Sequence, residues 1–257
     1  MSLSSLLEAV ADVAQVAGDT AMQWFGRGVA VETKGDGSPV TIADRSAEEA
    51  ARAWITTRFP QDGVQGEEFP PIRPDAKRQW IIDPIDGTKA FVRGVPLWGA
   101  LVAVCEGDDV LAGAACFPAV RELVNAAPGE GCWWNGARAQ VSTVASLAEA
   151  TVLITDERFA ERPTRGARWR RLAHEAGVAR TWGDCYGYLL LATGRAEVMV
   201  DDIVNPWDAA ALYPVITEAG GVFTSWKGVS TAFGGDIIAT NAALAAVVRE
   251  QLQEFDA

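Results

Sequence analysis

The chain has 257 residues, 49% of them hydrophobic and 22% charged, and its 22 basic and 34 acidic residues give a net charge of −12. This composition is enough to bury a large core and excludes disordered, collagen-like and fibrous classes. A strongly acidic surface repels nucleic acid and anionic membranes, so neither is an expected partner. It also repels anionic substrates, so a phosphate-binding site in this chain requires locally fixed cations or metal ions.

Targeting and cysteine patterns favour a cytoplasmic protein. The N-terminus has no basic segment followed by an apolar run of signal length, and no stretch approaches the roughly 20 apolar residues of a membrane span. The cysteines form no CxxC pair and match no zinc spacing, so we expect reduced, mostly buried thiols. They are Cys105, Cys116, Cys132 and Cys185.

The first half of the chain begins with helical periodicity and continues with strand-like runs. Apolar residues at helical spacing predict an amphipathic helix over 3–26, and a second helix is expected over 44–58 after a glycine-rich loop. Short apolar runs then follow at 79–82, 98–105 and 110–117. The turn signals between these runs predict adjacent antiparallel strands, and residues 130–136 predict a strand that ends in an Asn-Gly turn.

The second half mixes strands and helices more evenly. Strands are expected at 151–155, 197–200 and 237–239, and helices at 169–176, 186–193, 207–219 and 242–255. This mixture predicts a layered α/β or α+β body. No flexible linker separates the halves, so we expect a single domain over 1–257, with an N-terminal lobe of about 1–140 and a C-terminal lobe of about 141–257.

The most informative segment follows the apolar run at 79–82. Asp83 and Asp86 lie three residues apart, Pro84 restricts the turn between them, and Gly87 permits close backbone approach. Two carboxylates concentrated at a strand end are costly unless cations neutralise them. Oxygen ligands of this kind suit magnesium, manganese or calcium rather than zinc or copper.

The residues that follow add an anion site to this candidate metal site. Residues 88–93 predict a short helix, and the amide groups at a helix start bind anions. A metal site beside a phosphate cradle is what phosphoryl transfer requires. The alternative is a pair of surface turns, Asp-Pro followed by Asp-Gly, with no chemical role.

The hexapeptide from Asp83 to Thr88, Asp-Pro-Ile-Asp-Gly-Thr, resembles the signature of the inositol monophosphatase family of magnesium-dependent phosphatases. Further matching segments occur in the expected order, at 38–44, 66–68, 206–210 and 218–221. The resemblance spans roughly 34–221. It implies an αβαβα sandwich, hydrolysis of a small phosphate monoester, and a homodimer.

The resemblance also implies a set of metal ligands. Glu67, Asp83 and the carbonyl of Ile85 would hold one Mg²⁺ ion, while Asp83, Asp86 and Asp208 would hold a second. Glu67 would share a third, weaker ion, so two or three ions are expected in each site. Asp208, taken alone, is also a candidate helix N-cap, and the two roles are compatible.

The same resemblance places catalytic and phosphate-binding groups around these ligands. Thr88 and Asp44 would orient or deprotonate the attacking water, with Glu67 in the catalytic set, and the Gly87 and Thr88 amides would hold the phosphate. Because a metal ion lowers the pKa of a bound water, no strong protein base is required. His174, the sole histidine, is expected on a solvated helix face.

Two further charged residues have open interpretations. Glu68 is interpreted as a solvated neighbour of Glu67 in preference to a ligand. Lys34 either touches phosphate or water in its loop or is simply exposed.

The substrate is suggested by a more detailed resemblance. Residues 88–99, with Lys-x-Phe-x-Arg-Gly-x-Pro, and residues 180–188 are similar to the histidinol-phosphatase branch of the family. Histidinol phosphate carries an amine and an imidazole, so its pocket should offer carboxylates and aromatic faces. Candidate acids are Asp184, Asp201 and Asp202, and candidate faces are Trp182, Tyr186 and Tyr188. For the aromatics the alternative is core packing, and for Asp201 and Asp202 it is an exposed turn.

The expected reaction is hydrolysis of L-histidinol phosphate in histidine biosynthesis. Arg93 would pair with phosphate or with a carboxylate, or else lie at a surface helix end. An inositol-1-phosphatase or broad sugar phosphatase with the same catalytic set is the first alternative. A non-catalytic divalent-metal-binding protein is the second, and the presence of Thr88, Asp44 and Glu67 argues against it. A nucleotidase for adenosine bisphosphate is disfavoured because no basic cluster for a second phosphate is visible.

Overall fold

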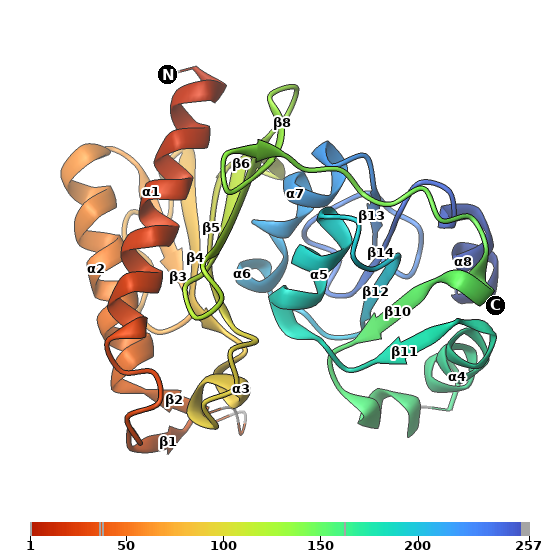
Figure 1. The fold of residues 1–257 in the computed structure, drawn as a ribbon. Coiled ribbons are helices and arrows are strands. Elements are labelled where there is room, and N and C mark those ends of the chain that lie inside the picture. Colours follow the sequence, from red (N-terminus) through yellow and green to blue (C-terminus); the bar gives the residue numbers. More distant parts are fainter. Residues whose placement is uncertain (1, 36, 38, 162, 253–257) are drawn as a thin grey trace.

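A computed structural model describes residues 2–35, 37, 39–161 and 163–252, and it shows two sheets alternating with three layers of helices (Figure 1). The first layer contains α1 (Leu3–Met22) and α2 (Ile42–Arg58), joined by a hairpin of β1 (Val31–Thr33) and β2 (Pro39–Thr41). Next comes a seven-stranded sheet with the order β3-β4-β5-β6-β7-β8-β9. Its strands are β3 (Gly63–Gly66), β4 (Arg78–Asp86), β5 (Gly99–Glu106), β6 (Asp109–Phe117), β7 (Glu122–Ala127), β8 (Gly131–Trp134) and β9 (Ala137–Arg138).

The middle layer separates this sheet from a five-stranded one of order β11-β10-β12-β14-β13 (Figure 1). The middle helices are α5 (Asp184–Ala192), α6 (Pro206–Ala209) and α7 (Leu212–Glu218). The strands are β10 (Thr151–Ile154), β11 (Val178–Arg180), β12 (Val198–Asp201), β13 (Val222–Thr224) and β14 (Ile237–Thr240). The outer helices are α4 (Arg165–Glu175) and α8 (Ala245–Leu252), and α3 (Thr88–Val92) follows β4. The expected αβαβα sandwich is confirmed.

Burial of both faces explains the continuous apolar runs of the central strands. On β4, Ile81 belongs to the core between the two sheets, whereas Trp80 and Ile82 belong to the core beneath α1 and α2. Side chains alternate between the faces of a strand, so a sheet covered on both faces needs apolar residues at successive positions. A third cluster, which includes Trp169 and Val248, lies under α4 and α8.

Strand pairing agrees with the antiparallel arrangement expected from the sequence. β4, β5 and β6 pair antiparallel, and Asn135 and Gly136 both have positive φ, 48° and 80°, in the turn between β8 and β9. The four cysteines are buried and free, as expected. The expected boundary near residue 140 lies between β9 and β10, but one core cluster includes residues from both sheets. The division into lobes therefore stays a prediction.

Several boundaries differ from those expected. The helix predicted over 3–26 ends at Met22, and the one predicted over 207–219 is divided into α6 and α7. The final helix begins at Ala245 because Asn241 Oδ1 accepts the Leu244 amide in a turn before it, and residues 253–255 lie outside the described residues. None of the helices in the described part of the chain has the length and apolar character needed to cross a bilayer.

Candidate active site

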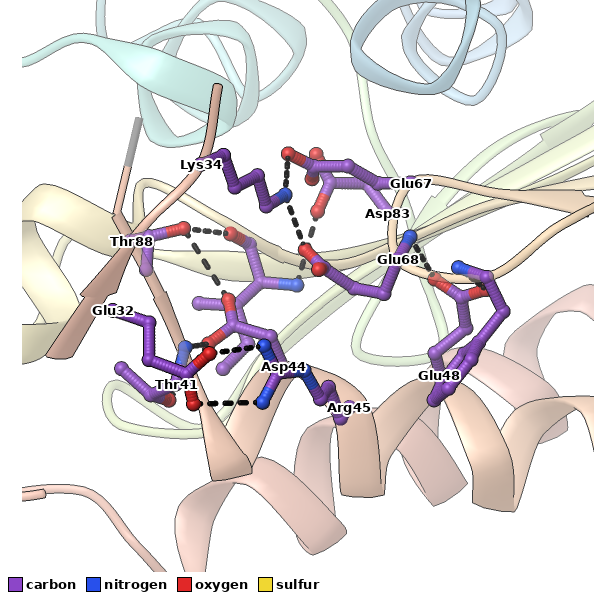
Figure 2. Close-up of polar contacts among 12 residues, drawn as sticks. Glu32, Lys34, Thr41, Asp44, Arg45, Glu48, Glu67, Glu68, Asp83 and Thr88 are labelled. Carbon is purple, nitrogen blue, oxygen red and sulfur yellow. Dashed lines mark hydrogen bonds and ion pairs between the residues drawn. The ribbon is translucent and has the colours of Figure 1, made fainter. Parts of the chain in front are cut away.

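Two acids reach the same sheet edge because β3 and β4 run in parallel. Gly66 pairs with Ile82 in this register, so Glu67 and Asp83 are the next residues of adjacent strands. Figure 2 shows the two carboxyl groups side by side. A separation of 16 residues in sequence thus becomes direct proximity in the structure.

A β-bulge brings Asp86 to the same side as Asp83. Asp83 pairs with Leu101 and Asp86 with Gly99, so three steps along β4 match two along β5. In a regular strand, residues three apart point to opposite faces, and the extra residue of a bulge reverses the second one. The expectation that the strand ends at Ile82 is therefore wrong, because β4 continues through the bulge to Asp86.

Asp208 completes the cluster from the opposite sheet–helix layer. It is the third residue of α6, and its Oδ2 accepts the backbone amide of Asn205 at 2.6 Å. Asn205 is therefore the N-cap and Asp208 the partner acid of a capping box, so the interpretation of Asp208 as the N-cap is wrong. One carboxylate oxygen from each of Asp83, Asp86 and Asp208 lies within 4.8 Å of the others.

The cluster is electrostatically unfavourable without a cation. Burial raises the pKa of Asp83, and the charges of Glu67, Asp86 and Asp208 raise it further. Burial also raises the pKa of Asp86, although the amide of Cys185, at the start of α5, opposes the rise by donating to Asp86 Oδ2. Carboxylates that repel one another this closely fit a hard divalent ion that binds oxygen ligands.

Asp44 and Thr88 meet beside the cluster (Figure 2). Thr88 Oγ1 lies 3.0 Å from the carbonyl of Ile85 and 3.4 Å from Asp44 Oδ1. The other oxygen of Asp44 accepts both the amide and the hydroxyl of Thr41, each at 2.7 Å, in a capping box at the start of α2. The helix cap thus fixes one oxygen of Asp44 and leaves the other directed at Thr88.

Lys34 lies within this acidic group and is not a freely exposed loop residue. Its Nζ is 2.6 Å from Glu67 Oε1 and 2.5 Å from Glu68 Oε1 (Figure 2). Burial alone would lower the pKa of Lys34, but the hydrogen bonds to the two glutamates raise it overall. The side chain of Glu68 is only 4% exposed, so its interpretation as a solvated residue is wrong. Burial raises the pKa of Glu68 to about 7.

Comparisons with known proteins agree with this geometry. A profile of the inositol monophosphatase family matches residues 2–255. The chain belongs to the inositol monophosphatase family. It is 41% identical over 240 residues to a histidinol-phosphatase of Chlorobaculum parvum, covering 93% of each chain. A histidinol-phosphatase of Mycobacterium tuberculosis is 40% identical over 219 residues, covering 83% of this chain and 84% of that protein.

Solved structures give the same result. The crystal structure of the extragenic suppressor protein suhB from Bartonella henselae matches with a TM-score of 0.91 and 26% identity, covering 98% of this chain and 100% of that one. Membership of the inositol monophosphatase family makes the protein a phosphoric monoester hydrolase. The family is generally metal-dependent, in agreement with the carboxylate cluster.

In this phosphatase, Gly87 joins the bulge of β4 to α3. Its φ is +88°, and an added Cβ would lie 2.9 Å from the carbonyl oxygen of Leu97. Glycine is therefore required both for the left-handed backbone and for the close approach. Together with Thr88, Lys89, Pro39 and Asp184 it lines a hollow of about 120 Å³.

A larger hollow of about 390 Å³ lies nearby and is rich in acids. Its lining includes Asp156, Asp201, Asp202, Lys89 and Arg158. A smaller hollow shares Asp201 with it and is also lined by Asp86, Asp184 and Asp208. The sequence-predicted acids Asp184 and Asp201 thus lie beside the candidate metal ligands. Burial raises the pKa of Asp184 to about 6.

The predicted aromatic faces and Arg93 are placed differently from one another. Tyr188 is 2% exposed and its hydroxyl donates to Asp201 Oδ2 at 2.8 Å, so it cannot offer a ring face to a substrate. Tyr186 is half-buried against Phe117, and Trp182 is exposed. Arg93 ends α3 and lines a separate hollow formed with residues 24–29. Its role in substrate binding stays a prediction.

Asp201 gives this phosphatase a distinct pH dependence of stability. Burial raises the pKa of Asp201 to about 7, although the Tyr188 hydroxyl opposes the rise. The native state therefore holds a proton that the unfolded chain releases near pH 4, and the free energy of unfolding falls as pH rises from about 4 to 7. In EDTA, Asp201→Asn should flatten this dependence, as measured by urea unfolding at a series of pH values. The exposed turn variant Asp109→Asn should follow the wild type, and a parallel curve for Asp201→Asn would contradict the raised pKa.

Proposed function

We propose that this phosphatase hydrolyses L-histidinol phosphate to L-histidinol and phosphate, with two or three Mg²⁺ ions at the carboxylate cluster. The observation that carries the proposal is the acid-lined hollow beside that cluster, which includes Asp201 and Asp202. An ammonium group and an imidazole suit such a lining, because carboxylates stabilise nearby positive charge. The names of the two histidinol-phosphatases reported above support the same substrate.

The ligands proposed for the ions come from both sides of the site. Glu67, Asp83 and the carbonyl of Ile85 would hold one ion, and Asp83, Asp86 and Asp208 would hold another. Bound divalent ions would lower the pKa of water and neutralise charge on the leaving oxygen. The packing of α6 against β4 supports this arrangement, since it brings Asp208 to the bulge.

The remaining residues would orient the water and the phosphate. Thr88 Oγ1, held between Ile85 O and Asp44 Oδ1, would direct the attacking water, and Asp44 would accept the proton. Burial raises the pKa of Asp44, which suits a proton acceptor better than an ordinary aspartate does. The Gly87 and Thr88 amides would hold the phosphate, and Asp184 and Asp201 the alcohol portion.

Two alternatives use the same observations. An inositol-1-phosphatase, or a broad sugar phosphatase, would keep the whole metal cluster and use Asp201 as a hydroxyl acceptor. A divalent-metal-binding protein without turnover would not need the contact between Asp44 and Thr88, so that contact favours an enzyme. A homodimer stays a prediction from the family resemblance.

The experiment that tests the substrate is phosphate release with Mg²⁺ from L-histidinol phosphate and from inositol-1-phosphate at equal concentration, with EDTA as control. We expect faster release from histidinol phosphate and none in EDTA. Loss of a charged hydrogen bond costs about 1.5–3 kcal/mol, so Asp201→Asn should reduce this preference by roughly 10- to 100-fold. Preference for the inositol ester would keep the metal chemistry and contradict the substrate. Release from neither ester would contradict the enzymatic proposal.

A further inference from the structure

The loop that carries Glu67 is held by a buried carboxylate on α2. Glu48 has no exposed surface, and its Oε2 accepts the backbone amide of Glu68 at 2.8 Å. Its Oε1 lies 3.3 Å from the amide of Phe69 (Figure 2 shows Glu48 beside this loop). The carboxylate therefore binds the two backbone amides directly after Glu67.

Arg52, one turn further along α2, holds the carbonyl side of the same loop. Its Nε donates to Glu48 Oε1 at 2.7 Å, and its Nη2 and Nη1 donate to the carbonyls of Phe69 and Pro70, each at 2.9 Å. The guanidinium is nearly buried. Five hydrogen bonds thus connect one side-chain pair to the backbone of residues 68–70 and to each other.

The glycine before Glu67 is fitted to this pair. An added Cβ at Gly66 would lie 2.1 Å from Glu48 Oε1, far inside van der Waals contact. Gly66 also pairs with Ile82 in the parallel register, which places the following residue beside Asp83. The acid Glu67 is therefore fixed on one side by the sheet and on the other by the Glu48–Arg52 pair.

A buried ion pair is a weak source of stability, because desolvation offsets most of the attraction between its charges. Burial raises the pKa of Glu48, while its loop amides and Arg52 oppose the rise. Precise placement of the loop is a better physical reason for the pair. Groups that orient a metal ligand typically change metal affinity by roughly 10- to 100-fold when they are removed.

We propose that Glu48 and Arg52 are positioning residues that hold the 66–70 loop so that the Glu67 carboxylate faces Asp83. The inference rests on the proposed role of Glu67 as a metal ligand and adds to it residues that touch neither metal nor substrate. It also explains why α2 carries an acid and a base on its buried face.

The test measures Mn²⁺ binding to metal-stripped protein by electron paramagnetic resonance, without substrate. Glu48→Gln should weaken Mn²⁺ binding by about 10-fold, whereas Glu49→Gln, an exposed neighbour on α2, should leave it unchanged. Glu67→Gln should also weaken binding and raise the Mg²⁺ concentration needed for half-maximal phosphate release. Because Glu48 acts through Glu67, adding Glu48→Gln to Glu67→Gln should cause little further loss.

A KM measurement at saturating Mg²⁺ separates positioning from general damage. In Glu48→Gln the KM for the phosphate ester should stay unchanged and kcat should recover toward the wild-type value. Gly66→Ala pushes on the same contact from the loop side and should weaken Mn²⁺ binding as well. That variant provides the measurement if Glu48→Gln fails to fold.

The outcomes separate this inference from the proposed function. Unchanged Mn²⁺ affinity in folded Glu48→Gln, or full additivity with Glu67→Gln, would overturn the positioning role alone. Weakened Mn²⁺ binding in a protein that hydrolyses neither ester would support the positioning role and contradict the phosphatase assignment of substrate. Absence of Mn²⁺ binding by the wild type would overturn both.

Discussion

Asp86→Asn should abolish turnover while leaving the protein folded. The substitution removes one of three carboxylates whose oxygens lie within 4.8 Å of one another, and it retains a carbonyl oxygen to accept the Cys185 amide. Metal ions contribute several kcal/mol of transition-state stabilisation, so we expect kcat/KM to fall by about 10³-fold or more. Phosphate release at several Mg²⁺ concentrations measures this effect.

The same variant should be more stable than the wild type when metal is absent. Burial and the charges of Asp184 and Asp208 raise the pKa of Asp86, so its ionised form opposes folding at neutral pH. Asn removes that charge, and the Tm in EDTA should rise. Asp109→Asn, in the exposed turn between β5 and β6, is the matched control and should change neither activity nor Tm. Near wild-type turnover in Asp86→Asn would show that Asp86 is not a ligand.

Asp44→Asn and Thr88→Ala should each reduce kcat by about 100-fold or more, with a smaller change in KM. The hydroxyl of Thr88 lies 3.4 Å from Asp44 Oδ1 and 3.0 Å from Ile85 O, so the two side chains form one unit. Groups that act as a unit are strongly non-additive, and the double variant should be scarcely slower than the slower single one. Steady-state kinetics on all three variants measures this coupling.

Two controls distinguish this coupling from a damaged helix cap. Thr88→Ser retains the hydroxyl and should keep most of the activity. Thr41→Val removes the hydroxyl that donates to Asp44 Oδ2 but leaves the Asp44 carboxylate in place, so it should lower the Tm more than kcat. Additive losses in the double variant would mean that Asp44 and Thr88 contribute independently.

Local patterns were sufficient for most elements. The helical spacing in α1 and the apolar runs of β4 to β6 reflect burial on one or both faces, which the order of residues encodes directly. β7 was not predicted because its alanines and Asn125 have little strand preference, and it is held by pairing with β6 and β8. The short strands β11 and β13 are likewise defined by their neighbours in the sheet.

The candidate site divides in the same way. A residue three before each of Asp44 and Asp208 is a capping residue, Thr41 and Asn205, and this spacing was a readable signal that the sequence interpretation missed. Glu48 and Arg52, at i and i+4, are typical of an exposed helix pair. Nothing in their spacing indicates that the pair is buried against the 68–70 loop.

The sequence by itself determined the residue types of the site, the family motif and the helices and strands that carry them. Those features depend on residues a few positions apart, so their physical causes are local. Only the tertiary structure decided that the β4 bulge turns Asp83 and Asp86 to one side, that parallel pairing sets Glu67 beside Asp83, and that α6 brings Asp208 to them. These placements depend on strand register and layer packing between distant segments, because a shift of one residue in register would direct a carboxylate to the opposite face of the sheet.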